Sequence, residues 1–283
     1  MNDAFPTGKP HVSYSEVRCW KECPFRHKLS YIDKIDLGDP SPYLDYGTAV
    51  HAQAEQYLNT KTMDFDKLET DLKEAWEKYG FDSEEYIESQ RAYRESQGWK
   101  PKPHHYIDEW IEWAKICLKD LPGFLDTNFP NWELVSAEEM LYEPIPGRSL
   151  KFKGFIDGLI KCDGPGNRRV YWVIDWKTAP PRGWMRDKRR DFNTQAQIAL
   201  YKSFWRAKNS LPSKDVKCAF VLLKRESKPN KSCELITVSA GPTVEERARK
   251  MVGSMITSVQ KGLYLKNRNS CLFCEYKNTE RCP

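Results

Sequence analysis

Two charged residues interrupt an apolar stretch of the sequence, "YWVIDWKTA". Asp175 and Lys177 are two positions apart, and because side chains alternate across a β-strand, they share one face while Trp176 takes the other. An earlier apolar stretch, "GFIDGLI", carries Asp157. If the two stretches form a hairpin that turns about Gly166, Asp157 lies opposite Asp175. The sequence therefore predicts two carboxylates side by side on neighbouring strands.

Two neighbouring carboxylates need a compensating charge. Like charges directly opposite each other on adjacent strands are destabilising, and burial raises the cost. Mg²⁺ or Mn²⁺ would offset it, since these hard cations prefer carboxylate oxygens. A bound divalent ion lowers the pKa of a water and polarises a phosphate oxygen, as phosphodiester hydrolysis requires. Lys177 would then orient the nucleophile or stabilise charge on the phosphate. The alternative is an ion-paired patch on a half-solvated sheet face, which the apolar flanks of both stretches disfavour.

The elements that would position these residues follow from hydrophobic periodicity. The first 120 residues are typical of helices, with a helix over 46–60 and a turn-like break at "QGWKPKPHH". A β-rich second half follows, and Thr243 with Glu246 fits a capping box at the start of the last helix. A mixed sheet with helices on its faces is the expected architecture. The second half is read as strands over 132–143, 150–162, 170–179, 216–224 and 233–239, and helices over 191–207 and from 243.

Composition and charge narrow the class of protein. The chain has 283 residues, 40% of them hydrophobic and 30% charged, which is a globular composition with enough residues for a substantial core. No apolar run approaches the ~20 residues of a membrane span, and the N-terminus lacks the pattern of a signal peptide, so we expect a cytoplasmic protein without membrane association. The net charge of +5 permits a polyanionic partner but is too small to indicate one by itself.

The pattern "GFIDGLI", followed 18 residues after its aspartate by "DWK", resembles the PD-(D/E)XK nuclease superfamily, in particular its RecB-type exonuclease branch. This resemblance implies an α/β, restriction-endonuclease-like fold with a mixed central sheet flanked by helices. It also implies one nuclease domain over residues 1–283, with a helical insertion at about 60–130.

The same resemblance implies further site residues. "YGTAVHAQAE" is similar to a helix carrying a metal-binding histidine, which would be His51, and "QAQIALY" is similar to a Gln-x-x-x-Tyr signature, which would be Gln197 and Tyr201. An upstream acid of the family would be Glu138 or its neighbour Glu139, and the spacing to Leu141 favours the former. The implied catalytic residues are Asp157, Asp175, Lys177, Gln197 and Tyr201, and the implied ligands of Mg²⁺ or Mn²⁺ are His51, Glu138, Asp157 and Asp175.

The C-terminal tail carries a second candidate metal site. "NSCLFCEYKNTERCP" supplies Cys271, Cys274 and Cys282, and a Cys-x-x-Cys pair with a third thiolate nearby is typical of a metal centre. In the resembled branch the fourth ligand comes from the N-terminal region, which here would be Cys23. The resemblance implies an iron–sulfur cluster, of the 4Fe–4S type, that joins the tail, residues 265–283, to Cys23. Structural Zn²⁺ is the alternative occupant, and Cys19 is an alternative ligand.

The expected substrate is DNA, single-stranded or with free ends. The segment "RGWMRDKRR", residues 182–190, has five basic residues and one acid, and with Trp184 it could follow phosphates and stack on a base. The sequence contains no Gly-x-x-x-x-Gly-Lys-Ser/Thr loop, so any unwinding would come from a helicase or recombination partner. We expect an exonuclease of recombination, repair or replication in a bacterial or phage-infected cell, or of CRISPR spacer acquisition. A structure-specific endonuclease and a non-catalytic subunit that binds DNA ends are the alternatives.

Overall fold

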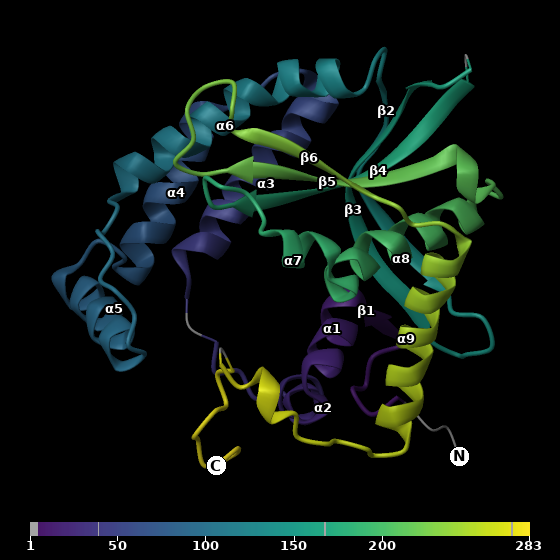
Figure 1. Ribbon diagram of the computed structural model, residues 1–283. Helices are drawn as coiled ribbons and strands as arrows, with labels where there is room; N and C mark the ends of the chain where they lie inside the picture. Colours follow the sequence, from purple (N-terminus) through teal and green to yellow (C-terminus); the bar gives the residue numbers. More distant parts are fainter. Residues whose placement is uncertain (1–4, 39, 167, 273) are drawn as a thin grey trace.

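A central mixed sheet covered by helices organises the molecule, as the sequence predicts (Figure 1). The computed structural model describes residues 5–38, 40–166, 168–272 and 274–283. The strands run in the order β1-β3-β4-β5-β6, and β2 pairs with β3 outside this path. The strands are β1 (His11–Ser13), β2 (Glu133–Pro144), β3 (Lys151–Gly164), β4 (Arg168–Ala179), β5 (Val216–Lys224) and β6 (Cys233–Val238).

Strand β3 has a gap along one of its edges. Antiparallel β2 follows its other edge along nearly the whole strand, so β1 and β4 must share the remaining edge. Parallel β1 pairs with residues 151–153 and antiparallel β4 pairs with residues 158–164. Residues 154–157, which include Asp157, therefore lie between the two partners, where no described strand pairs with this edge.

The hairpin of β3 and β4 has the predicted register. Gly158 lies opposite Ile174 and Gly164 lies opposite Arg168, a register that would place residue 157 opposite residue 175. The ladder stops one step short of that pair, at Gly158 and Ile174. From there β4 continues beside β5 through Ala179, so the two predicted acids lie where β3 and β4 separate.

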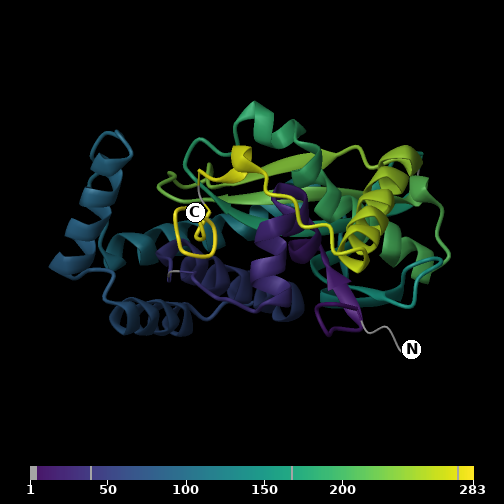
Figure 2. The ribbon, with the colours of Figure 1, turned by 90° about the horizontal axis from the view of Figure 1, so that it is seen from below.

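Helices cover both faces of the sheet (Figures 1 and 2). Helices α1, α8 and α9 pack on the face that includes Phe152 and Phe220, and α3 and α6 pack on the face that includes Trp176, with α4 packed on these two helices. Short elements complete the chain. The helices are α1 (Tyr14–Glu22), α2 (Pro24–His27), η1 (Lys28–Ile32), α3 (Pro42–Thr60), α4 (Phe65–Tyr79), α5 (Glu84–Ser96), α6 (Ile107–Asn128), α7 (Arg186–Arg190), α8 (Phe192–Lys208), η2 (Ser213–Asp215), α9 (Pro242–Gln260) and η3 (Arg268–Ser270).

Two local sequence predictions need correction. The sequence predicts helices for the first 120 residues, but residues 11–13 form strand β1, which pairs with β3. Ser13 then caps α1 by accepting the N–H of Glu16. The capping box of the last helix is wrong. Helix α9 begins at Pro242, because the fixed φ of proline suits the first helical position, and Gly241 at its N-cap has no side chain to accept a hydrogen bond.

Helices α4 and α5 form an arm that projects from the sheet (Figure 2). Leu68, Leu72 and Trp76 anchor α4 against α3 and α6, whereas α5 has no buried residue. Among the described residues, no helix has the length and apolarity to cross a membrane.

Candidate active site

Asp157 occupies the point where β3 loses its pairing with β4. Its Oδ2 accepts the backbone N–H of Trp176 at 2.7 Å, and the same oxygen lies 3.6 Å from Nδ1 of His51 on α3. The carboxylate thus takes the place of a strand–strand hydrogen bond. Burial raises the pKa of Asp157 well above its ordinary value, and the negative charge of Asp175 raises it further.

Asp175 is almost completely buried and lies beside Lys177. Only 1% of Asp175 is exposed, and burial raises the pKa of its carboxyl. The ammonium of Lys177 lies 2.7 Å from Asp175 Oδ2 and offsets part of this cost. Burial alone would lower the pKa of Lys177, but the two aspartates raise it, so the lysine is held in its charged form. Trp176, between them, packs into the core on the opposite face.

His51 faces the aspartates as a neutral imidazole. Burial lowers its pKa to about 4, and the positive charge of Lys177 contributes to the decrease. A neutral imidazole keeps a nitrogen lone pair, which a metal ligand requires. Helix α3 holds this position, since it begins at Pro42 and buries Tyr46, Val50 and Ala54 on the sheet side.

The two neighbouring glutamates of β2 point to different surroundings. Burial raises the pKa of Glu138, as do the negative charges of Glu55 and Asp175, so Glu138 faces the acids of the site. Its backbone has φ of +51°, a conformation that L-residues rarely adopt and that functional sites often contain. Glu139 instead accepts a hydrogen bond from Ser136 and lies 3.0 Å from the ammonium of Lys208.

Helix α8 brings Gln197 and Tyr201 toward the same region. Asp191 caps this helix, and the amide of Gln197 donates to the hydroxyl of Tyr201 at 3.4 Å. The ring of Tyr201 lies so close to β3 that a Cβ on Gly154 would stand 2.7 Å from its Cε1. Glycine at this position is what allows α8 to approach. Burial raises the pKa of Tyr201, which therefore remains a neutral phenol.

The basic segment 182–190 lies beside this site, but the predicted stacking of Trp184 is wrong. Trp184 is buried, with its ring centroid 5.0 Å from that of Phe220, and Lys188 covers it. Arg189 turns inward to Glu234. The other four cations are exposed, and none has an ion pair with any residue that the structure describes; they are Arg182, Arg186, Lys188 and Arg190.

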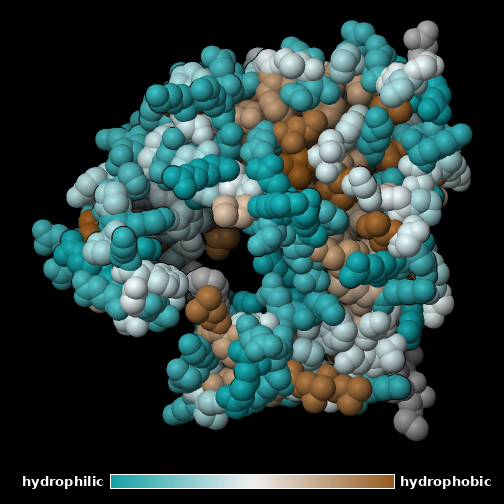
Figure 3. Space-filling view, viewed as in Figure 1, coloured by the Kyte–Doolittle hydropathy of each residue, from teal (hydrophilic) through white to brown (hydrophobic). Residues whose placement is uncertain are grey.

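An opening is lined by residues of both the candidate active site and the C-terminal tail, and Figure 3 shows the molecular surface hollowed. It has a volume of about 700 Å³. Its lining includes Lys177 and Gln197, residues of helix α1 and of the segment 30–38, and Glu275 with Tyr276 of the C-terminal tail. Sequence reasoning missed α1 as part of the site, because a single arginine on an amphipathic helix, here Arg18, gives no signal of function.

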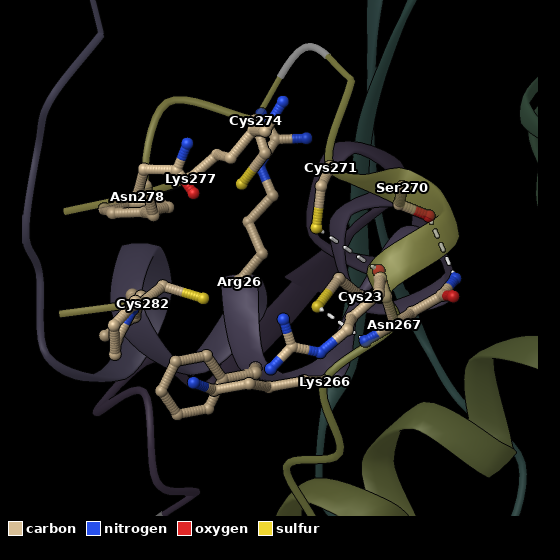
Figure 4. Close-up of a pocket in the computed structure, with 15 residues that line it drawn as sticks. Cys23, Arg26, Lys266, Asn267, Ser270, Cys271, Cys274, Lys277, Asn278 and Cys282 are labelled. Carbon is tan, nitrogen blue, oxygen red and sulfur yellow. Dashed lines mark hydrogen bonds between the residues drawn. The ribbon is translucent and has the colours of Figure 1, made fainter.

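The four predicted cysteine ligands line a separate cavity of about 180 Å³ (Figure 4). Their sulfur atoms point toward a shared space in Figure 4. Cys19 lines the neighbouring opening instead, where burial raises its pKa to about 11. The four cavity cysteines are Cys23, Cys271, Cys274 and Cys282.

Hydrogen bonds hold the tail against α2. The backbone N–H of Phe25 donates to Leu265 O at 3.2 Å, and Arg26 forms an ion pair with Glu275 at 2.9 Å. Within the four described ranges of the chain, no group of three or more His, Cys, Asp or Glu side chains is arranged to hold a metal ion. This holds for the cysteine cavity and for the acids of the sheet.

Comparison with known proteins identifies the family. The family model described as the PD-(D/E)XK nuclease superfamily matches residues 11–283, nearly the whole chain. The chain belongs to the PD-(D/E)XK nuclease superfamily. The restriction-endonuclease-like fold class and the superfamily that the sequence predicts are thereby confirmed. No curated protein matches this PD-(D/E)XK chain.

Solved structures resemble this PD-(D/E)XK chain in fold. One is the crystal structure of a provisionally named exonuclease from Eubacterium rectale, with a TM-score of 0.54 and 13% sequence identity over 97% of this chain and 90% of that chain. Another is the crystal structure of SSO0001, with a TM-score of 0.33 and 16% identity over 93% of each chain. At these identities the first likeness supports the fold alone.

Proposed function

We propose that this protein is a divalent-metal-dependent DNA exonuclease. The observation that carries the proposal is the pair Asp157 and Asp175, a half-buried and a buried carboxylate with raised pKa on separating strands of a PD-(D/E)XK fold. Lys177 neutralises only one of these charges. A bound cation would neutralise the other charge and offset the cost of placing two carboxylates close together.

The residues around the acids fit Mg²⁺ or Mn²⁺. Carboxylate oxygens and one neutral imidazole are donors that these ions accept, and His51, Glu138, Asp157 and Asp175 are proposed as the ligands. When bound, the ion supplies an activated water and polarises the scissile phosphate. The described side chains are not arranged around a single ion, so we propose that these residues move toward the ion when it binds.

Lys177 and the residues of α8 have separate proposed roles. The ammonium of Lys177 stays charged and would hold the attacking water or stabilise negative charge that develops on the phosphate. Gln197 lies at the edge of the opening beside Lys177, and its hydrogen bond to Tyr201 fixes its direction. The pair would orient the DNA strand relative to the acids.

Four exposed cations support DNA as the substrate. Phosphates attract such unpaired cations independently of base sequence, and segment 182–190 presents them beside the site. Lys188 of this segment lies close enough to the active site to sense its charges. Burial lowers the pKa of Lys188, and the positive charges of Arg18 and Lys177 lower it further. Among the described elements we identify no motif that would place a helix in a DNA groove to read base sequence. We therefore propose a RecB-type enzyme that acts at DNA ends in recombination, repair or replication.

We further propose that the four-cysteine cavity holds a 4Fe–4S cluster. Four thiolates are its usual ligand set, and a cluster occupies space of its own between the sulfur atoms. A structural Zn²⁺ would instead need all four sulfur atoms about 2.3 Å from one point. The open cavity of about 180 Å³ favours the cluster. Iron and sulfide analysis of anaerobically purified protein tests this assignment, and stoichiometric zinc without iron would refute it.

The proposed activity is tested with labelled DNA. Linear single- and double-stranded DNA, labelled at one end, and a closed single-stranded circle are incubated with Mg²⁺ or Mn²⁺ and either wild type or Asp175→Ala. We expect the wild type alone to degrade linear DNA and to leave the circle intact. A cut circle would indicate the endonuclease alternative. Linear DNA that stays intact with folded wild-type protein would reject the proposed activity.

A further inference from the structure

Strand β3 presents an exposed aromatic ring beside the candidate active site. On the face that packs against α8, Phe152 of this strand stacks on Phe204, with ring centroids 4.5 Å apart. Because side chains alternate along a strand, Phe155 points to the opposite face. Phe155 is 42% exposed, although it lies only two residues before Asp157 on the same strand. A large apolar side chain therefore faces solvent next to a proposed metal ligand.

Strand β2 extends this exposed face. Met140 lies directly opposite Phe155 in the β2–β3 ladder and is 54% exposed. The next pair on the same face joins Tyr142 to Lys153. In the other direction Met140 is two residues from Glu138, which faces the acids of the site. We call Met140, Tyr142, Lys153 and Phe155 the platform, a row of side chains that leads along two strands to the acids.

Positive charges gather around the platform. The ammonium of Lys151 lies 4.5 Å from the ring centroid of Tyr142. On the neighbouring strand β1, burial lowers the pKa of His11, and the positive charges of Lys153 and Lys9 lower it further. Within the described parts of the chain, these three lysines have no ion pair. Their charges therefore remain able to contact an anionic ligand.

The nearby acids of β2 leave these cations unpaired. Glu139 and Glu143 point toward α8, where they lie 3.0 Å and 3.8 Å from the ammonium of Lys208. The platform is therefore apolar at its centre and positively charged around it. Exposed aromatic rings on a sheet, with cations beside them, are a common means of binding single-stranded nucleic acid. A nucleotide strand fits both the charge and the shape of this face.

We propose that Phe155 and Met140 form a subsite for the base of the nucleotide beside the scissile phosphate. The inference rests on the proposed nuclease function and adds how the substrate is positioned. Two residues of a strand span about 7 Å, which is about the reach of one extended nucleotide. A base stacked on Phe155 would therefore bring its own phosphate to Asp157, and Lys153 would contact the next phosphate along the strand.

Stacking on the platform selects for the state of a base and against no particular sequence. Every base has a π face that an aromatic ring accepts, so the subsite would bind all four. A base within a duplex is paired and stacked on its neighbours, and it must leave them before it can lie on Phe155. The subsite would thus recognise an unpaired nucleotide without reading its identity.

Substrates that lack one base test the subsite through kinetics. An abasic residue is placed on one side or the other of a single scissile bond, and kcat/KM is measured for that bond. For wild type we expect a fall of about 5- to 100-fold with one of the two substrates, since stacking a base contributes about 1 to 3 kcal/mol. Phe155→Ala should show the same fall on the intact substrate and no further fall on the abasic one.

Two further variants control this comparison. Phe155→Trp keeps a ring that can stack and should retain the wild-type pattern. Val135→Ala removes another exposed apolar side chain of β2, outside the platform, and should also retain it. If the losses from the missing base and from Phe155→Ala add in full, the base does not contact Phe155 and the proposal is overturned.

A crosslinking experiment locates the base without requiring cleavage. Single strands that carry one iododeoxyuridine near an end are bound to wild-type protein in EDTA and irradiated, and the crosslinked peptides are identified by mass spectrometry. We expect crosslinks at Phe155 or Met140 that disappear in Phe155→Ala. Crosslinks confined to other elements, or a failure of the strand to bind, would reject the subsite.

The phosphate contact of the platform is tested through salt dependence. Each phosphate contact to a single strand contributes about 0.7 to the slope of log affinity against log salt. We expect Lys153→Ala to reduce the magnitude of that slope by about 0.7. Lys250→Ala, an exposed cation in an i,i+4 pair with Glu246 on α9, is the matched control and should leave it unchanged. An unchanged slope in Lys153→Ala would remove this lysine from the contact with the strand.

These experiments separate the subsite from the activity. If wild type cleaves DNA but Phe155→Ala cleaves intact and abasic substrates as wild type does, the nuclease proposal stands and the subsite is wrong. If the strand crosslinks to Phe155 but nothing is cleaved with any divalent metal, the subsite stands as a binding surface and the nuclease proposal is wrong.

Discussion

Asp157 and Asp175 show how a sequence pattern translates into chemistry at the scale of single residues. The alternation of side chains in "YWVIDWKTA" correctly predicts that Asp175 and Lys177 share a face opposite Trp176. The pattern could not predict that Asp157 replaces a ladder hydrogen bond by accepting the N–H of Trp176. That contact depends on where β3 and β4 separate. The separation point depends in turn on the pairing of β1 with β3 and of β5 with β4, and both partners come from distant parts of the chain.

Metal-free protein should become more stable when Asp157 is replaced by asparagine. Asparagine can still accept the Trp176 N–H, but it carries no charge to desolvate. Because the native pKa of Asp157 is raised, the native state binds its proton more tightly than the unfolded state does. The stability of wild type therefore falls as pH rises from about 4 through that raised pKa.

We expect Asp157→Asn to raise the free energy of unfolding by about 1 to 3 kcal/mol at pH 8 in EDTA, as measured by chemical denaturation. The gain should vanish at low pH, where both proteins are uncharged at this position. Asp163→Asn, on the same strand but exposed and paired with Arg169, is the control and should change stability by less than about 0.5 kcal/mol. A loss of stability in Asp157→Asn at pH 8 would contradict the account.

Glu138 and Glu139 offer a matched pair of variants. Glu138→Gln removes a charge that faces Asp175, and we expect it to weaken Mn²⁺ binding about 10- to 100-fold in a calorimetric titration. Glu139→Gln alters only the contacts with Ser136 and Lys208 and should leave Mn²⁺ binding unchanged. The reverse ranking would show that the wrong glutamate has been assigned to the metal.

At the scale of elements, the sequence predicts what local periodicity encodes. The strands β2 to β6, helix α8 and the register of the β3–β4 hairpin all follow from alternation, turn residues and amphipathic stripes. Strand β1 was missed because three residues, "HVS", are too short for a pattern, and it exists only through pairing with β3. The burial of Trp184 was missed because its partner Phe220 is on another strand.

The close approach of α8 to β3 depends on Gly154. A methyl group at this position would meet the ring of Tyr201, so Gly154→Ala should force α8 outward and destabilise the protein by about 1 to 3 kcal/mol. Gly253→Ala in α9 meets no atom within 4 Å and should be neutral or stabilising by up to about 1 kcal/mol. Thermal unfolding of both variants measures the difference, and equal behaviour would argue against tight packing at Gly154.

At the scale of the whole molecule, the two ends of the chain meet beside the opening. The backbone N–H of Asn267 lies 3.4 Å from the sulfur of Cys23, and Tyr276 contacts the chain after η1. The four cysteines were predicted as one set from the family resemblance and the tail spacing. The opening was not predicted, because its wall combines α1, α8, β4 and the tail, and no local pattern encodes that combination.

Loss of the proposed cluster should loosen this wall. We expect Cys23→Ser to abolish bound iron and to lower the midpoint of thermal unfolding, since binding at a site that exists only in the folded state stabilises that state. Cys19→Ser is the matched control, four residues earlier on α1 but outside the cysteine cavity, and should retain the iron. Iron retained by Cys23→Ser at the wild-type level would remove Cys23 from the ligand set.

The central claim is that Asp157 and Asp175 hold a divalent ion for phosphodiester hydrolysis, and a titration of cleavage with Mg²⁺ tests it most directly. The rate of nucleotide release from a linear, end-labelled single strand is measured against Mg²⁺ concentration for wild type, Asp175→Asn and Glu139→Gln. We predict a saturable increase for wild type and Glu139→Gln, and a rate at least about 100-fold lower for Asp175→Asn at every concentration. Cleavage by Asp175→Asn at the wild-type rate, or cleavage by wild type in EDTA, would contradict the account.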